Sequence, residues 1–151
     1  CAAFSPIIKK ILKDYDGKIR FAARYMPLHP NSLNAANLTE AAGEQGKFWQ
    51  ARELLFQKQP EWGEKHGAPA TAARPDISTL FENYAMELGI DVNKMNAAIK
   101  ENRYAAKIEL DKKDGQGLGV RKTPQFFVNG RMLARFGEGE LRALIDDELS
   151  R

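Results

Sequence analysis

The sequence contains little of what metal centres, disulfide scaffolds and membrane helices require. Its 151 residues include one cysteine and two histidines. One cysteine cannot form a disulfide within the chain, and two isolated histidines without cysteine or carboxylate at ligand spacing make a poor zinc site. No uncharged apolar run approaches the ~20 residues of a membrane-spanning helix. We therefore expect no metal and no cofactor.

Neither sign of charge dominates. The 23 lysines and arginines stand against 20 acidic residues, for a net charge of +3. The basic residues are interspersed along the chain, whereas nucleic-acid binders usually gather them in a patch or stripe, so no nucleic-acid partner is expected. A chain of this length buries roughly two thirds of its unfolded surface and is expected to form one compact unit, with room for a subdomain.

Hydrophobic spacing predicts a helix, a strand, a block of helices, a hairpin and a last helix. Period-3.6 patterns mark the helices, and an alternating IRFAARYM run marks the strand. Asn129-Gly130 between apolar runs is the strongest short-range hairpin signal, because both turn residues must take positive φ. The predicted elements are helices over 5–15, 32–44, 47–57, 76–88, 92–100, 103–115 and from about 137, a strand over 19–26, and hairpin strands over 126–128 and 132–136.

Five further motifs occur in a fixed order along nearly the whole chain. They are Cys-Ala-Ala-Phe at 1–4, RYMPLHP at 24–30, AAGEQGKFW at 41–49, LGID at 88–91 and GVRKTPQFFVNG at 119–130. Together they resemble the DsbA-like disulfide oxidoreductases. The resemblance implies an α/β, thioredoxin-like fold with an inserted α-helical domain: residues 1–30 and 118–151 form the thioredoxin-like domain, and residues 31–117 the insertion.

The resemblance also implies the site. In this family the redox motif is Cys-x-x-Cys, and Cys1 matches its second, resolving cysteine; the attacking cysteine would lie three positions earlier. Thr123-Pro124 matches the cis-proline loop that faces the redox cysteines. A cis bond without an N–H at Pro124 would leave the Thr123 backbone free to pair with an extended substrate. The implied catalytic residues are Cys1, Thr123 and Pro124.

The implied activity is thiol-disulfide exchange in a bacterial periplasm or other extracytoplasmic space. Its partners would be proteins with thiols or disulfides and a redox partner protein. The family's central strand would precede Cys1, and without it the sheet would leave backbone groups unpaired. We expect either a polypeptide that continues before Cys1, which we favour, or a strand-swapped or homo-oligomeric assembly.

Several alternatives stay open at this stage. Taken alone, Cys1 fits a buried inert cysteine, and a first-position cysteine also fits a lipid anchor. A kappa-type glutathione-dependent isomerase or transferase and a redox-inactive chaperone or binding module are the rival functions. Of the other candidates, His29 marks a boundary, His66 lies in a solvated loop, Gly115–Gly119 forms a helix cap and linker, and Phe48, Trp49 and Leu54–Phe56 form helical core.

Overall fold

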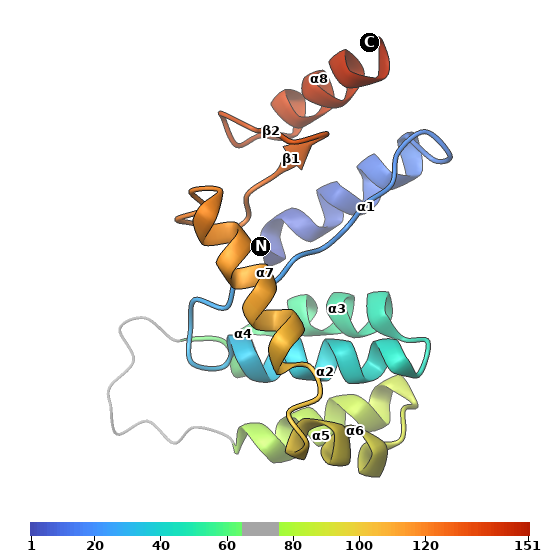
Figure 1. Cartoon of the computed structure of the whole chain (residues 1–151). Helices are drawn as coiled ribbons and strands as arrows, with labels where there is room; N and C mark the ends of the chain where they lie inside the picture. Colours follow the sequence, from blue (N-terminus) through green and yellow to red (C-terminus); the bar gives the residue numbers. More distant parts are fainter. Residues whose placement is uncertain (65–75) are drawn as a thin grey trace. The chain divides into compact units, whose positions relative to one another are not determined.

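A computed structural model describes residues 1–64 and 76–151. Those residues form mostly helices with one small sheet (Figure 1). The predicted His66 lies outside the described residues. In chain order the elements are η1 (Ala2–Phe4), α1 (Ser5–Asp14), α2 (Ser32–Glu44), α3 (Phe48–Gln57), α4 (Gln59–Trp62), α5 (Ile77–Leu88), α6 (Val92–Lys100), α7 (Ala105–Gly117), β1 (Phe127–Val128), β2 (Arg131–Met132) and α8 (Glu138–Leu149).

The chain divides into two compact units. Unit 1 comprises Cys1–Arg24 and Gly115–Arg151, and unit 2 comprises Tyr25–Asp114. The domain boundaries predicted from the sequence, 30/31 and 117/118, lie six and three residues after those of the two units. The assignment of these segments as a thioredoxin-like domain and an inserted domain stays a prediction.

Unit 1 joins the first helix, the hairpin and the last helix around a small apolar core. Its buried members are Ile8 and Ile11 of α1, Leu133, and Leu141 and Ile145 of α8. The hairpin pairs Phe127 with Met132 and Val128 with Arg131 in antiparallel register. Asn129 and Gly130 have φ of 48° and 82°, so the predicted turn is confirmed, although both strands are shorter than the sequence predicted.

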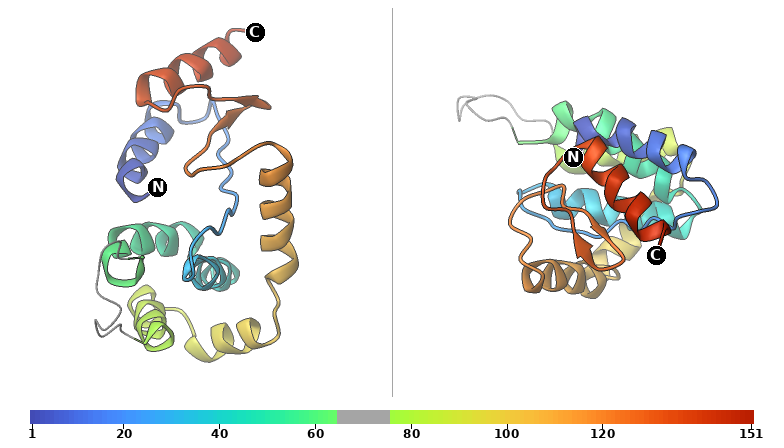
Figure 2. Two further views of the ribbon diagram at one scale, coloured as in Figure 1. Left: turned by 90° about the vertical axis from the view of Figure 1, so that its left-hand side faces the viewer. Right: turned by 90° about the horizontal axis from the view of Figure 1, so that it is seen from above.

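Unit 2 is a helical block. In Figure 1 and in the left view of Figure 2, α2 and α3 pack together with α5 and α6, and these four helices contribute most of the core of unit 2. Local signals explain where the helices begin and end. The N-cap carboxylates of Asp76 and Asp91 accept from backbone N–H groups of the first turns of α5 and α6, at 3.2 and 3.0 Å. Gly89, at φ 73°, ends α5 in the left-handed region.

Three expectations about secondary structure need correction. The predicted strand over 19–26 is wrong: the sheet in the described residues contains β1 and β2 only, and a strand forms only when a neighbour accepts its hydrogen bonds. A short helix, α4, lies where the sequence predicted a break at Pro60. Proline is tolerated in the first turn of a helix. The linker predicted over Gly115–Gly119 begins later, since α7 continues to Gly117.

One expectation about the core is also wrong in part. Leu54 and Leu55 are buried as predicted, but Trp49 is 49 % exposed. The guanidinium of the half-buried Arg52 lies 6.0 Å from the centroid of the Trp49 ring, so an exposed aromatic and a partly buried cation are neighbours on this part of α3.

Candidate functional site

Cys1 lies at the beginning of a continuous helical segment. It caps η1, and its carbonyl accepts the N–H groups of Phe4 and Ser5 at 3.0 and 3.2 Å. α1 follows directly, with Pro6 in its first turn. The thiol is free and Cys1 is exposed in the described chain.

A cluster of three phenylalanines joins this N-terminal turn to the loop that contains Thr123-Pro124. The Phe4 ring lies 5.5 Å from Phe126 and 4.1 Å from Phe136, and Phe126 stacks on Phe136 at 6.0 Å. Cys1 is three residues from Phe4, and Thr123 is three residues from Phe126. The two predicted site segments are therefore anchored to the same aromatic cluster.

The Thr123-Pro124 peptide bond is cis. Thr123 is exposed and Pro124 is half-buried. The next residue anchors the loop, because the Gln125 side-chain amide donates to the carbonyl of Leu133 at 3.0 Å. This contact connects the loop to the chain that follows β2, and no sequence motif predicts it.

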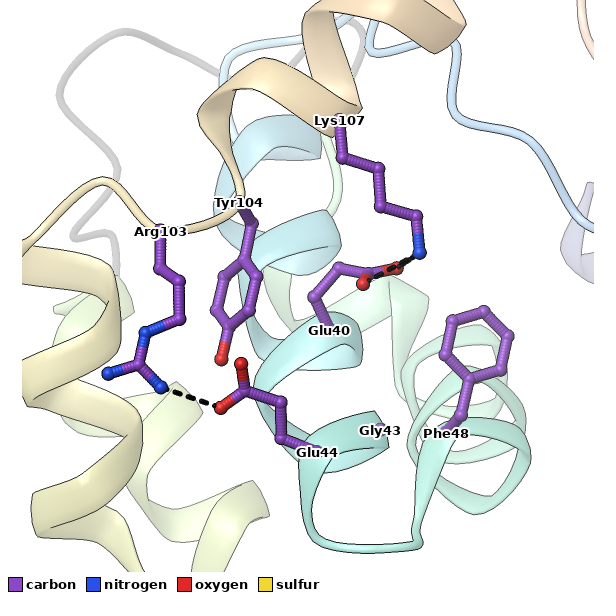
Figure 3. Close-up of a pocket in the computed structure, with 7 residues that line it drawn as sticks. All are labelled: Glu40, Gly43, Glu44, Phe48, Arg103, Tyr104 and Lys107. Carbon is purple, nitrogen blue, oxygen red and sulfur yellow. Dashed lines mark hydrogen bonds and ion pairs between the residues drawn. The ribbon is translucent and has the colours of Figure 1, made fainter.

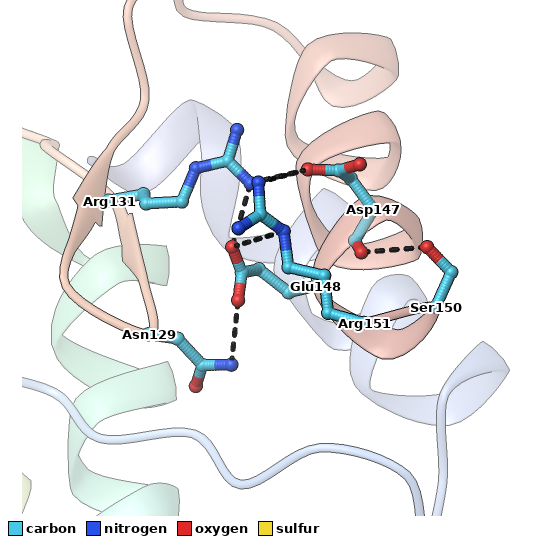
Figure 4. Close-up of polar contacts among 6 residues, drawn as sticks. All are labelled: Asn129, Arg131, Asp147, Glu148, Ser150 and Arg151. Carbon is cyan, nitrogen blue, oxygen red and sulfur yellow. Dashed lines mark hydrogen bonds and ion pairs between the residues drawn. The ribbon is translucent and has the colours of Figure 1, made fainter.

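A second polar network in unit 1 fastens the hairpin to the C-terminal end of α8 (Figure 4). Arg131 donates to both Asp147 and Glu148, the latter at 2.7 Å, and Asn129 donates to Glu148 at 3.1 Å. The Arg131 guanidinium holds the pKa values of both carboxyls below their usual range, with a smaller contribution from Asn129 at Glu148. Acidic residues at a helix C-terminus oppose the helix dipole, and this arginine offsets that cost.

Unit 2 contains a buried polar network that sequence reasoning missed. The Tyr25 hydroxyl donates to Glu40 at 2.7 Å, and Lys107 donates to both oxygens of Glu40 at 2.9 Å. The backbone N–H of Tyr25 donates to Asp111 at 3.0 Å. Burial, followed by the hydrogen bond to Glu40, raises the pKa of Tyr25 well above its usual range. Tyr25 therefore stays a neutral donor at physiological pH.

Beside this network lies a cavity of about 470 Å³ (Figure 3). A second ion pair forms part of its wall, with Arg103 donating to Glu44 at 2.9 Å. Tyr104 lies between the two ion pairs; the residue is 95 % buried within unit 2, and its hydroxyl is directed toward Glu44 (Figure 3). Within the described residues this hydroxyl has no hydrogen-bond partner. Burial and then the adjacent Glu44 carboxylate raise the pKa of Tyr104 to about 12.

The expectations about His29, about metal sites and about membrane-spanning helices are each compared with the described residues. The His29 Nδ1 lies 2.7 Å from a carboxylate oxygen of Glu64, and the His29 backbone N–H donates to Ser32 at 3.2 Å, at the entry to α2. Across residues 1–64 and 76–151, no group of three or more His, Cys, Asp or Glu side chains could hold a metal ion. In that same part of the chain, no helix combines the length and apolar character needed to cross a membrane.

Comparisons with known proteins identify relatives of this chain. Over 134 residues it is 34 % identical to "Na(+)/H(+) antiporter NhaA 3" of Salinispora tropica. The aligned segment covers 87 % of this chain and 18 % of the relative. The "Na(+)/H(+) antiporter NhaA" of Herminiimonas arsenicoxydans is 31 % identical over 115 residues, covering 76 % of this chain and 16 % of the relative. The chain thus spans less than a fifth of the length of these two relatives.

A family model described as thioredoxin matches residues 1–147. The match includes Cys1, the whole helical block and the Thr123-Pro124 loop. This match does not identify the DsbA-like subfamily, and it does not test the helical insertion. At the level of the match, the chain belongs to the thioredoxin family.

Proposed function

We propose that this chain carries out thiol-disulfide exchange through Cys1. The observation that carries the proposal is the exposed Cys1 thiol at the start of a helical segment, in a chain of the thioredoxin family. Helix N-termini favour a thiolate, which is the nucleophile in disulfide exchange. The phenylalanine cluster supports the proposal, because it ties this turn to the Thr123-Pro124 loop.

In the finer form of the proposal, Cys1 is the resolving cysteine of a DsbA-like Cys-x-x-Cys motif. A client would be joined to the preceding cysteine as a mixed disulfide. The Cys1 thiolate attacks the sulfur of that preceding cysteine, a new protein disulfide forms, and the client leaves as a thiolate that takes up a proton. The client is reduced and the protein is oxidised; the reverse sequence oxidises the client. The 151 residues supply one of the two sulfurs.

Thr123 and Pro124 have a positioning role in the proposal. Thr123 is exposed, and in the proposal its backbone groups pair with an extended client segment, which would bind by adding a strand. The clients would be proteins with thiols or disulfides, and a redox partner protein would restore the starting state. A bacterial extracytoplasmic location belongs to the same proposal. The antiport activity in the relatives' names is not part of the proposal, because the shared segment is a small fraction of their length.

A second candidate is a monothiol reaction with glutathione of the kappa type, in which the free Cys1 thiol reacts and the Thr123-Pro124 loop would bind the glutathione backbone. In that reaction Cys1 thiolate attacks glutathione disulfide, forms a Cys1–glutathione mixed disulfide and releases one glutathione thiolate. No second protein cysteine is needed for this step. Reading the residue three positions before Cys1 in the natural polypeptide separates the candidates: cysteine supports the dithiol reaction and serine supports the kappa type.

The reactivity of Cys1 tests the proposal directly. The reduced 151-residue chain is mixed with glutathione disulfide, and formation of the mixed disulfide is followed by intact-mass spectrometry. An unstructured peptide containing Cys-Ala-Ala-Phe is measured in the same way for comparison. We expect the folded chain to react at least tenfold faster than the peptide, and Cys1→Ser to give no adduct. Equal rates for chain and peptide would show that the fold does not activate this thiol.

A mass measurement on the natural polypeptide tests the dithiol form. After reduction and alkylation we expect two modified cysteines and a mass above 16.9 kDa. A mass of 16.9 kDa with one modification would contradict the Cys-x-x-Cys proposal and would leave monothiol exchange, strand swapping or a binding role.

A further inference from the structure

The net positive charge of this chain belongs to unit 1. The side chains of unit 1 carry 12 positive and 7 negative charges, a net charge of +5, whereas those of unit 2 carry 11 positive and 13 negative charges, a net charge of −2. Cys1 and the Thr123-Pro124 loop both lie in unit 1. The field around the proposed site should therefore favour anionic molecules.

Five of the seven acidic side chains of unit 1 already have a partner within the unit. They are Asp14 and Glu138, paired with Arg142; Asp147 and Glu148, paired with Arg131 and Arg151 (Figure 4); and Asp146, which accepts from the Tyr15 hydroxyl. The other two are Asp16, which follows the end of α1 opposite Cys1, and Glu140, in the first turn of α8. The acids of unit 1 therefore mainly neutralise the cations of the hairpin and α8.

Three exposed cations, Arg121, Lys122 and Arg135, flank the proposed site. Arg121 and Lys122 directly precede Thr123, and Arg135 directly precedes Phe136 of the phenylalanine cluster. None of these flanking cations forms an ion pair or a side-chain hydrogen bond within residues 1–64 and 76–151. Their charges are therefore available to a molecule that approaches from solvent.

The phenylalanine cluster places the flanking cations and Cys1 in one region of unit 1. The Phe136 ring, next to Arg135 in the chain, lies 4.1 Å from the Phe4 ring. Three residues of chain span at most about 11 Å, so Cys1 stays near Phe4, and Thr123 stays near its own end of the cluster. At an ionic strength of about 0.1 M, where the Debye length is about 10 Å, the flanking cations act on the charge of a molecule bound at Cys1.

We propose that the Cys1 site selects acidic client segments, in which the reacting cysteine lies beside aspartate or glutamate; the inference rests on the thiol exchange proposed above. The flanking cations attract the client carboxylates and repel basic clients by the same field. In the exchange, the Cys1 thiolate attacks one sulfur of a client disulfide and a mixed disulfide forms. The other client sulfur leaves as a thiolate that takes up a proton.

The test compares disulfides that differ only in charge. Symmetric disulfides of the acetylated, amidated tripeptides Glu-Cys-Gly, Gln-Cys-Gly and Lys-Cys-Gly are doubly negative, neutral and doubly positive. Each is mixed with the reduced 151-residue chain or with the unstructured peptide containing Cys-Ala-Ala-Phe, and the rate for the chain is divided by the rate for the peptide. We expect this ratio to be at least tenfold higher for Glu-Cys-Gly than for Lys-Cys-Gly at low ionic strength, and the difference to shrink in about 1 M salt.

The neutral disulfide separates this inference from the proposed function. A ratio of one for Gln-Cys-Gly, with the charge preference retained, would contradict the activation of Cys1 and support the cationic site. Equal ratios for the three disulfides, or the highest ratio for Lys-Cys-Gly, would overturn the inference whether or not Cys1 is activated. Glutathione disulfide is also doubly negative. A ratio for it more than tenfold above that of Glu-Cys-Gly would show recognition of glutathione itself and overturn the assignment to acidic protein segments.

Substitutions locate the charge preference on the flanking cations. The test variant combines Arg121→Gln, Lys122→Gln and Arg135→Gln. The matched control combines Lys13→Gln, Lys18→Gln and Arg20→Gln, which removes three exposed cations of the same unit at or beyond the end of α1 opposite Cys1. We expect the preference for Glu-Cys-Gly over Lys-Cys-Gly to fall below about threefold in the test variant and to stay within about twofold of the wild type in the control. Equal preferences in the two variants would overturn the proposal.

Discussion

The backbone N–H of Tyr25 donates to the Asp111 carboxylate at 3.0 Å, and this bond joins the two ends of unit 2. Tyr25 is the first residue of the unit, and Asp111 lies three residues before its last, Asp114. The chain therefore enters and leaves the helical block at points held together by a buried carboxylate. The tyrosine side chain adds a second bond to Glu40 at 2.7 Å.

Replacing Asp111 by alanine should destabilise unit 2 by about 2 kcal/mol, because a partly buried N–H loses its acceptor. Urea unfolding followed by tryptophan fluorescence measures the change, since Trp49 and Trp62 both belong to this unit. The control is Glu109→Ala on the same helix, an exposed acid paired with Lys112 at 4.0 Å, which should cost less than about 0.5 kcal/mol. Equal destabilisation by the two substitutions would show that Asp111 contributes no more to the stability of unit 2 than an exposed acid does.

The Phe4–Phe126 contact should couple the N-terminal turn to the Thr123-Pro124 loop. In a double-mutant cycle with Phe4→Leu and Phe126→Leu, we expect a coupling free energy of about 1 kcal/mol. Pairing Phe4→Leu with Leu149→Ala is the control, because Leu149 is 47 % exposed and lies outside this core. Additive free energies for both pairs would mean that the aromatic contact does not link the two segments.

The helices were predictable from the sequence because their signals are local. α2 has the predicted bounds, and Asp76, Asp91 and Gly89 mark helix ends by capping chemistry that acts within a few residues. The predicted strand over 19–26 failed for the opposite reason. Its alternation of half-buried and exposed residues is present in the structure, but the hydrogen bonds of a strand depend on a distant neighbour.

The candidate site was predictable only in part. Cys1, Thr123 and Pro124 came from the resemblance to a known family, and their catalytic roles stay predictions. The polar network in unit 2 was missed, because Tyr25 and Asp111 are far apart in sequence and neither forms a motif. One signal was available in the sequence. Glu40 and Glu44 are two charges of the same sign four residues apart, and so are Arg103 and Lys107. This spacing favours opposite charges on a neighbouring helix.

Gly89 should resist substitution because its φ of 73° lies in the left-handed region. Gly89→Ala is expected to lower the free energy of unfolding by about 1 kcal/mol, and Gly89→Asn by less, since asparagine tolerates this conformation better. The control is Gly139→Ala in the first turn of α8, where an added Cβ meets nothing within 4 Å. That variant should be neutral or slightly stabilised, because alanine favours helix more than glycine does. Chemical unfolding of the three variants would check the order.

The Arg131 network predicts a specific loss of stability in acid. Asp147 and Glu148 have ordinary pKa values of 3.8 and 4.5, and Arg131 lowers both in the folded state. A carboxyl with a lowered folded-state pKa contributes stability that is complete above its ordinary pKa and disappears as the pH falls through the folded value. The contact between the hairpin and α8 should therefore be at full strength at pH 7 and weaken below the ordinary pKa values.

Arg131→Met removes the cation and keeps much of the side-chain volume. We expect its melting temperature to be lower than that of the wild type at pH 7, and the difference to shrink as the pH falls below 4.5, the ordinary pKa of Glu148. Arg135→Met is the matched control, because it removes one positive charge from an exposed residue of the same unit. Thermal unfolding from pH 7 to pH 3 measures all three proteins. A difference between Arg131→Met and the wild type that stays constant across this range would show that the two carboxylates are not held by Arg131.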